Sequence, residues 1–185
     1  MVTMRPKAGF TLMEAMLSVA IVGIVSGLGA TLLLQANRYF VLGKARADLQ
    51  KEARGIMYIM TRELRQAQNS TILISRASNS QPYYSRINFT KQQGTVVTLY
   101  QNGNLLCLAT KASAFTLTQG GQPVCRTSGG GVATTLTKNL RYLAFTFPRS
   151  DDMTILSVSM TIQTSIYQGK TKALHMASEN VRVMD

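Results

Sequence analysis

The apolar positions of this chain follow three successive patterns along its length. The first pattern is an unbroken apolar run, Ala15–Leu34, without a charged residue. As a helix this run spans roughly 30 Å, the hydrocarbon thickness of a bilayer, and it therefore predicts a membrane-spanning helix. One alternative is a buried core helix, for which a chain of 185 residues offers little cover. Another is a cleaved secretory signal, but no A-x-A-like site ends the run.

The second pattern is a stripe with a helical period. Its steps are three or four residues, through Leu42, Ala45, Leu49, Ala53, Ile56, Met60, Leu64 and Ala67. No proline interrupts residues 10–69, so we expect one helix of about 60 residues, roughly 90 Å long. Residues 10–34 are its predicted membrane part. Residues 35–69 are its predicted amphipathic part, which continues into a globular domain and docks on it.

The third pattern, from residue 70 onwards, alternates with a period of two and predicts strands. The predicted strands are Thr71–Ser75, Ile87–Thr90, Thr95–Tyr100, Leu105–Ala109, Phe115–Thr118, Leu140–Phe147 and Ile155–Thr164. Asn102-Gly103 favours a hairpin with a type I′ turn. We therefore expect an α+β protein in which residues 70–185 form an antiparallel β-rich domain, with the amphipathic helix covering one face of its sheet.

Glu14 lies at the edge of the apolar run, where an ionised carboxylate costs about 3 kcal/mol on insertion scales. One interpretation is a capping box, because Thr11-x-x-Glu14 has the required spacing. The other is that Glu14 pairs with a cation that another chain supplies at the same depth. A newly formed α-amino group would serve, since pairing offsets much of the cost of desolvation.

Two smaller features also suggest contacts. Gly23-x-x-x-Gly27 has the small-residue spacing that lets membrane helices approach closely, although glycine is common in such helices. Cys107 and Cys125 enclose 17 residues. In an oxidising compartment they would form a disulfide that stabilises the fold by about 3 kcal/mol, and the alternative is a pair of buried thiols.

Composition argues against catalysis. The chain has 20 Lys+Arg, 8 Asp+Glu and a single histidine, His175. It contains no nucleophile elbow, P-loop or zinc-binding motif, and Asp151-Asp152 is typical of a polar turn. We expect no enzyme activity, no metal and no cofactor. The net charge of +12 could attract nucleic acid, but the basic residues are scattered without interleaved aromatics.

The segment Lys7–Val25, KAGFTLMEAMLSVAIVGIV, resembles the processing site of type IV pilins and type II secretion pseudopilins. In that family a basic leader ends in glycine, phenylalanine follows, and a glutamate stands fifth in the mature chain. Gly9, Phe10 and Glu14 occupy these places. The resemblance implies that residues 1–9 are a leader which prepilin peptidase removes after Gly9, and that the Phe10 amine is methylated. It also implies a lollipop fold and pairing of Glu14 with the terminal amine of a neighbouring subunit.

The resemblance further implies a single-pass protein of the bacterial inner membrane, in contact with its lipid, whose C-terminal domain lies on the periplasmic or extracellular side. Its partners would be other major and minor pilin or pseudopilin subunits. Glu63–Ala67 and Asn139–Phe147 resemble J-type minor pseudopilins and W-type minor pilins, which implies a subunit at the filament tip or in initiation. The alternatives are a minor pilin that binds DNA for uptake and a signal-anchored envelope protein that never polymerises.

Overall fold

The computed structural model describes residues 9–82, 84–111, 114–128, 130–166 and 171–183. Residues 1–8, which hold nearly all of the predicted leader, lie outside this range. The chain divides into two compact units, with the boundary between Gly43 and Lys44. Each unit is described by itself below.

One helix, α1 (Leu12–Arg65, 54 residues), supplies the first unit and continues into the second. In the first unit it is apolar all round. Its most apolar 18-residue window has a mean hydropathy of 2.3 and contains no buried residue. Large apolar side chains such as Leu17 (63% exposed) and Leu34 (65%) therefore have no cover within the unit. α1 is the one helix in the described part of the chain that is long and apolar enough to cross a membrane.

The helix ends at Arg65, four residues before the predicted end. Beyond it the backbone pairs with the turn between two strands: Gln68 N–H donates to the Thr90 carbonyl (2.9 Å), and Ala67 bridges Lys91. A short 3-10 helix, η1 (Asn69–Thr71), follows. The helical period continues to Ala67, but these sheet-type hydrogen bonds replace the last turn of the helix.

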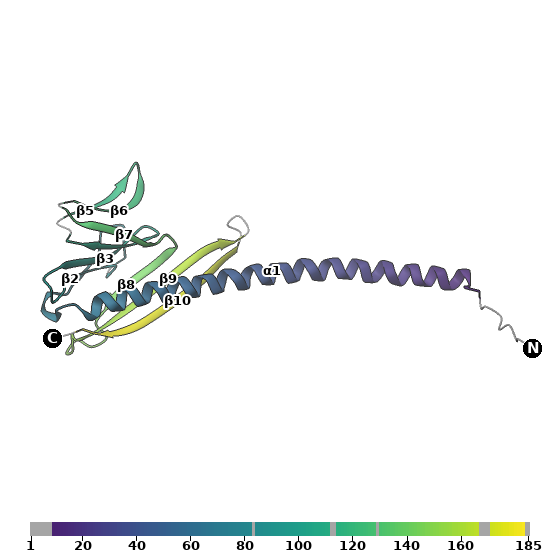
Figure 1. Ribbon diagram of the computed structural model, residues 1–185, viewed down its shortest axis with the longest axis horizontal. Helices are drawn as coiled ribbons and strands as arrows, with labels where there is room; N and C mark the ends of the chain where they lie inside the picture. The colour runs from purple at the N-terminus through teal and green to yellow at the C-terminus, as the bar shows by residue number, and fades with distance from the viewer. Residues whose placement is uncertain (1–8, 83, 112–113, 129, 167–170, 184–185) are drawn as a thin grey trace, which may run out of the picture. The chain divides into compact units, whose positions relative to one another are not determined.

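The second unit contains three antiparallel sheets (Figure 1). A five-stranded sheet has the order β1-β2-β3-β4-β7 and a three-stranded sheet has the order β10-β9-β8, while β5 and β6 form a hairpin. The bounds are β1 (Leu73–Ser75), β2 (Arg86–Thr90), β3 (Val96–Asn102), β4 (Leu105–Thr110), β5 (Ala114–Gln119), β6 (Gln122–Ser128), β7 (Val132–Thr137), β8 (Leu140–Thr146), β9 (Ile155–Ile166) and β10 (Thr171–Arg182). The α+β class is confirmed, with three sheets instead of the one expected.

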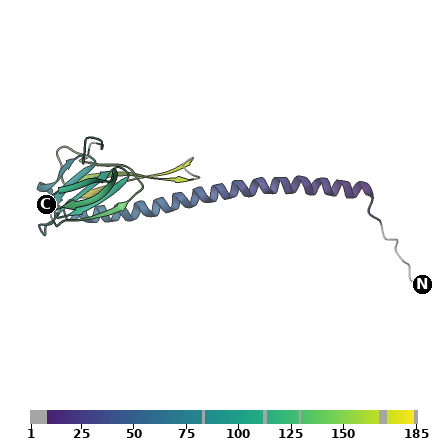
Figure 2. The same cartoon turned by 90° about the horizontal axis from the view of Figure 1, so that it is seen from above.

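The core of this unit lies between the last turns of α1 and the inner faces of the sheets (Figures 1 and 2). On α1 the buried apolar side chains follow the predicted stripe from Leu49 to Leu64, with Met57 beside it. On the strands they include Phe89, Leu99, Phe145, Leu156, Val158, Met160 and Ile162, all at most 1% exposed. Burial of side chains of this size contributes about 1.5–3 kcal/mol each, which is enough to fix the helix on the sheets.

Polar contacts join the helix to the sheets at the edges of this core. The Glu52 carboxylate accepts hydrogen bonds from the Thr137 hydroxyl and from Asn139 Nδ2 (3.1 Å). Glu63, only 6% exposed, pairs with Lys91 Nζ at 2.6 Å. Both acids lie on α1, so the docked part of the helix is held by charge as well as by apolar contact.

The five-stranded and three-stranded sheets meet along β3 and β8. The buried Gln101 carboxamide donates to the backbone oxygens of Gly103 (3.0 Å) and Arg141 (3.2 Å), and its oxygen accepts from Leu143 N–H (3.1 Å). Backbone bonds from Leu140 N–H to the Asn104 carbonyl extend the junction. β8, an edge strand of the three-stranded sheet, is thus joined to the five-stranded sheet at β3 and at the β3–β4 turn.

The β3–β4 hairpin is confirmed, but its turn differs from the predicted type. Asn102 pairs with Leu105, so the central residues are Gly103 and Asn104. Gly103 has φ +59°, and positive φ at the first central position is typical of a type II′ turn. A Cβ on Gly103 would lie 3.2 Å from Pro123 Cγ, so glycine is also required by close packing.

Three strands, β6, β7 and β10, were not predicted. In these strands the alternation of apolar and polar residues is weak, or the large apolar residues lie on the exposed face. On β10 the large apolar side chains, Leu174 (52% exposed) and Met176 (75%), face outward, while Ala173 and Val181 are buried. A search for buried apolar alternation therefore passes over this strand.

Candidate functional site: the processing and assembly segment

The predicted cleavage position lies just before the helix. Gly9, Phe10 and Thr11 have no helical structure, and α1 begins at Leu12. Phe10 is 73% exposed, and a Cβ built on Gly9 would meet no atom within 4 Å. The peptide bond between Gly9 and Phe10 is thus in irregular, accessible chain, which is the condition a protease needs to bind backbone in extended form.

Thr11 caps the helix. Its carbonyl accepts from Glu14 N–H (3.0 Å) and from Ala15 N–H (3.1 Å), and its Oγ1 accepts from Glu14 N–H at 3.3 Å. This is the first of the two hydrogen bonds of a capping box. The reciprocal bond, from Thr11 N–H to the Glu14 carboxylate, is not made in the described chain. Glu14 therefore takes part in capping the helix through its backbone N–H, and its side chain makes no capping hydrogen bond in the described chain.

The Glu14 carboxylate is exposed in the first turn of α1. A negative charge there interacts favourably with the helix dipole, typically by about 0.3–1 kcal/mol. The two salt bridges found within the described residues both involve Glu63, so neither engages Glu14. Within the described residues Glu14 therefore has no salt-bridge partner, and its pairing with another chain stays a prediction.

Gly23 and Gly27 lie four residues apart on the apolar helix, and a Cβ at either would meet no atom within 4 Å. Within this unit nothing requires glycine at these positions. The prediction that they permit close helix packing concerns contacts with other chains, and it stays a prediction.

The two cysteines are joined in the second unit. Cys107 on β4 and Cys125 on β6 form a disulfide, with Cα atoms 5.5 Å apart. Nearby, Asn102 Nδ2 donates to the backbone oxygens of Leu117 on β5 and Val124 on β6 (2.9 Å for Val124). The disulfide and Asn102 together fix the β5–β6 hairpin to the five-stranded sheet. The spacing of the cysteines suggested the pairing, whereas nothing in the sequence singled out Asn102.

No metal centre is present in the described ranges, since no three His, Cys, Asp or Glu side chains gather there. Asp152 instead closes a turn before β9, where Thr154 donates to Asp152 Oδ1 through both its hydroxyl and its N–H (2.9 Å for the N–H). These two hydrogen bonds, with a smaller contribution from Arg149 and Arg182, lower the pKa of Asp152. The side chain thus serves the turn, as the sequence predicted.

The geometry defines a class of protein before any comparison: a chain with an accessible cleavage position, a capped apolar helix able to span a membrane, and an α+β unit containing a disulfide. Comparison with known families then gives one match. Residues 4–30 match the prokaryotic N-terminal methylation motif, which covers Gly9, Phe10, Glu14 and both packing glycines. The match lies within the N-terminal segment, and the β-rich unit is outside it. Neither the curated proteins nor the solved structures contain a match to the chain.

The motif indicates a type IV pilin-like protein that undergoes prepilin processing. It implies processing by prepilin peptidase and assembly with other pilin subunits in general. Together with the long apolar helix, it is consistent with a single-pass, membrane-anchored protein.

Proposed function

We propose that this chain is a structural minor pilin or pseudopilin, without enzyme activity, that enters a type IV pilus or a type II secretion pseudopilus at its tip or in initiation. Prepilin peptidase removes residues 1–9 on the cytoplasmic side, and the new Phe10 amine is methylated. The β-rich unit lies on the periplasmic or extracellular side. The resemblance of Glu63–Ala67 and Asn139–Phe147 to minor subunits supports the subtype.

The observation that carries this proposal is the arrangement at the start of α1. An accessible Gly9–Phe10 bond, an exposed Glu14 and an uncovered apolar helix follow one another within a few residues. Cleavage creates an ammonium group four residues before Glu14 in every copy. In an apolar layer the carboxylate and a neighbour's ammonium stabilise each other, because either group alone is costly to desolvate.

Helix packing and this ion pair have different roles in assembly. The apolar side chains of residues 12–34 exchange lipid for neighbouring helices, which changes their hydrophobic free energy little. The ion pair fixes the register between subunits, because a shifted register leaves a carboxylate unpaired in the apolar layer.

The decisive measurement is the intact mass of the chain recovered from its host. We expect a chain that begins at Phe10 and carries one added methyl group. A Gly9→Val variant should keep its leader. Within this chain a side chain at position 9 would meet no atom, so the expected obstruction is of the peptidase's access to the Gly9–Phe10 bond. A native chain that still begins at Met1 in a host with an active prepilin peptidase would contradict the proposal and favour a signal-anchored protein that does not polymerise.

Assembly is tested separately from processing. Glu14→Ala should be cleaved normally but recovered in sheared filaments at about a tenth of the native amount or less, in line with an insertion cost of a few kcal/mol for an unpaired partner. Asp48→Ala is the matched control, because Asp48 is an exposed acid on the same helix in the second unit. Equal incorporation of the two variants would argue against the role of Glu14.

The alternative function is DNA capture during uptake, which the excess of 20 basic over 8 acidic residues favours. It predicts that the purified chain is retained on DNA and released steeply as salt rises. Absence of binding at low salt excludes this alternative.

A further inference from the structure

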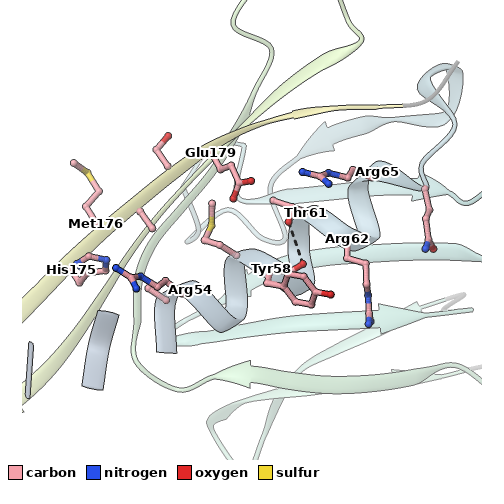
Figure 3. A pocket seen from close by; sticks show the side chains of 13 residues that line it. Arg54, Tyr58, Thr61, Arg62, Arg65, His175, Met176 and Glu179 are labelled. Atoms are coloured by element: carbon pink, nitrogen blue, oxygen red, sulfur yellow. Dashed lines mark hydrogen bonds between the residues drawn. The ribbon is translucent and has the colours of Figure 1, made fainter. Parts of the chain in front are cut away.

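An open groove of about 790 Å³ lies within the second unit, between α1 and β10 (Figure 3). One wall is the side of α1 that carries Arg54, Tyr58, Arg62 and Arg65. The other wall is β10, of which five consecutive residues, 175–179, line the groove. Successive side chains of a strand point to opposite faces. Because all five consecutive residues line the groove, it reaches the backbone of β10 as well as the side chains on one of its faces.

The groove exists because the apolar core is interrupted along the middle of β10, between the buried Ala173 and Val181. The inward residues of β9, from Leu156 to Ile162, are at most 1% exposed. Opposite Ile162, Met160 and Val158, β10 places His175, Ala177 and Glu179, and all three are only half-buried. Alanine is too short to reach the helix, and the polar residues beside it leave space that α1 does not fill.

The edge of β10 that is not paired with β9 is open among the described strands. β10 is 12 residues long and, among the described strands, pairs only with β9. A long open edge with unpaired N–H and C=O groups is a template for another strand. The outward side chains Leu174 and Met176 are 52% and 75% exposed, so an added strand would also find apolar contact on the other face.

The charges along the groove select the kind of segment that would add there. Three arginines, Arg54, Arg62 and Arg65, line the groove together with one carboxylate, that of Glu179. Arg62 contacts Glu63 at 3.2 Å, but Glu63 also holds Lys91, so the local balance stays positive. From Arg54 to Arg65 the helix rises roughly 16 Å, which a strand of about five residues matches.

We propose that the groove between α1 and β10 receives an extended acidic segment of a companion filament subunit. The segment adds as a strand to the open edge of β10 and directs carboxylates at Arg54, Arg62 and Arg65, while Tyr58, which is 68% exposed, covers it. Strand addition of this kind takes affinity from backbone hydrogen bonds and specificity from side-chain contacts. The partner's identity as a filament subunit rests on the proposed function.

A second copy of this chain does not fit. Its eight acidic residues are Glu14, Asp48, Glu52, Glu63, Asp151, Asp152, Glu179 and Asp185, and the only adjacent pair lies in a tight turn. Nucleic acid fits less well than a strand, because its sugar-phosphate backbone cannot continue the hydrogen-bond ladder of an open sheet edge.

The test uses the full chain in its native host, with p-benzoylphenylalanine in place of Tyr58. We expect light-induced crosslinking to a companion subunit, at a segment that mass spectrometry shows to be rich in Asp and Glu. The matched control places the same photoreactive residue at Tyr142, which is 44% exposed on β8. It should give no product with that segment.

Charge reversal tests the basis of recognition. Arg54→Glu combined with Arg65→Glu should lower the yield of the Tyr58-position crosslink about tenfold, as expected for loss of charge-assisted hydrogen bonds. Arg141→Glu, an exposed change on β8, should leave the yield unchanged. Replacing the acids of the crosslinked segment by arginine should restore the product in the double variant. A retained Cys107–Cys125 disulfide in each variant shows that the unit is folded.

Several results would overturn the inference: no product from the Tyr58 position, a crosslinked segment without acids, a second copy of this chain or nucleic acid as the partner, or equal yields before and after charge reversal. The same strains separate this inference from the proposed function. A mature chain that starts at Phe10 and enters filaments without the crosslink refutes the groove alone, whereas a chain that keeps its leader refutes the proposed function.

Discussion

Gln101 is the residue whose replacement we expect to weaken the β-rich unit most for the smallest change in shape. Its side chain is 4% exposed and makes three hydrogen bonds, of which two, with Arg141 and Leu143, join β3 to β8 and one holds Gly103 in the β3–β4 turn. Methionine has nearly the same length and makes none of them. In Gln101→Met the buried Leu143 N–H loses its acceptor, which costs about 1–3 kcal/mol, and two backbone oxygens each lose a bond of about 0.5–1.5 kcal/mol.

These contributions sum to about 2–6 kcal/mol of unfolding free energy, a large share of the roughly 5–15 kcal/mol of a typical domain. The melting temperature should fall by about 4–24 °C. The assay is a urea titration of the full chain in detergent micelles, followed by near-UV circular dichroism, which reports on the packing of tyrosines in the second unit. The native chain, Gln101→Met and the control variant below are measured in the same detergent.

Gln163→Met is the matched control. Gln163 accepts one hydrogen bond, from Arg141 Nη1 at 3.1 Å, at an exposed site. Its replacement should change stability by no more than about 0.5 kcal/mol. If the two variants lose the same free energy, the Gln101 carboxamide does not join the sheets and the magnitude worked out above is unfounded.

The remaining predictions concern three other features of the second unit. Replacing Cys107 and Cys125 together by serine should cost about 3 kcal/mol of stability, measured against the oxidised native chain, because an 18-residue separation is no longer constrained in the unfolded state. Gly103→Ala should destabilise by about 1 kcal/mol or more in the same assay, since alanine disfavours positive φ and its Cβ would contact a proline of β6. For Asp152, the lowered pKa means that the ionised carboxylate stabilises the folded state above its ordinary pKa of about 4, and that this stabilisation is lost as the pH falls through the lowered value. The difference in unfolding free energy between the native chain and Asp152→Asn should therefore be present at neutral pH and vanish in acid; a difference that persists there would contradict the assignment.

The sequence predicts best those features that depend on neighbouring residues. The helical period from Leu42 to Ala67 is local, and it predicted the second half of α1. The motif around Glu14 is also local, and it agrees with the family match at residues 4–30. The end of the helix is different, because Gln68 and Ala67 leave it to pair with residues 90 and 91. Such a tertiary hydrogen bond overrides a local period, and no local pattern reports it.

The strands that escaped prediction show the same limit. β10 exposes Leu174 and Met176 and turns alanine and polar residues inward, so its alternation looks inverted. Half of the residues of β7 are threonine and half of its residues are exposed, so β-propensity would have found this strand but a search for burial would not. The contacts of Gln101 and Asn102 lie beyond sequence reasoning, since buried amides look the same as exposed ones in a sequence.

One covalent helix passes through two stability regimes. Turns after Lys44 melt only when the strands beneath them separate, whereas turns before Gly43 have no tertiary contact within their own unit and depend on whatever solvent or chain surrounds them. Amide hydrogen exchange along α1 should thus show a step instead of a smooth gradient, slow beyond the boundary and set by the environment before it. Under the proposed function, the apolar part of α1 would exchange lipid for neighbouring helices, and this division of the helix would leave the β-rich fold undisturbed.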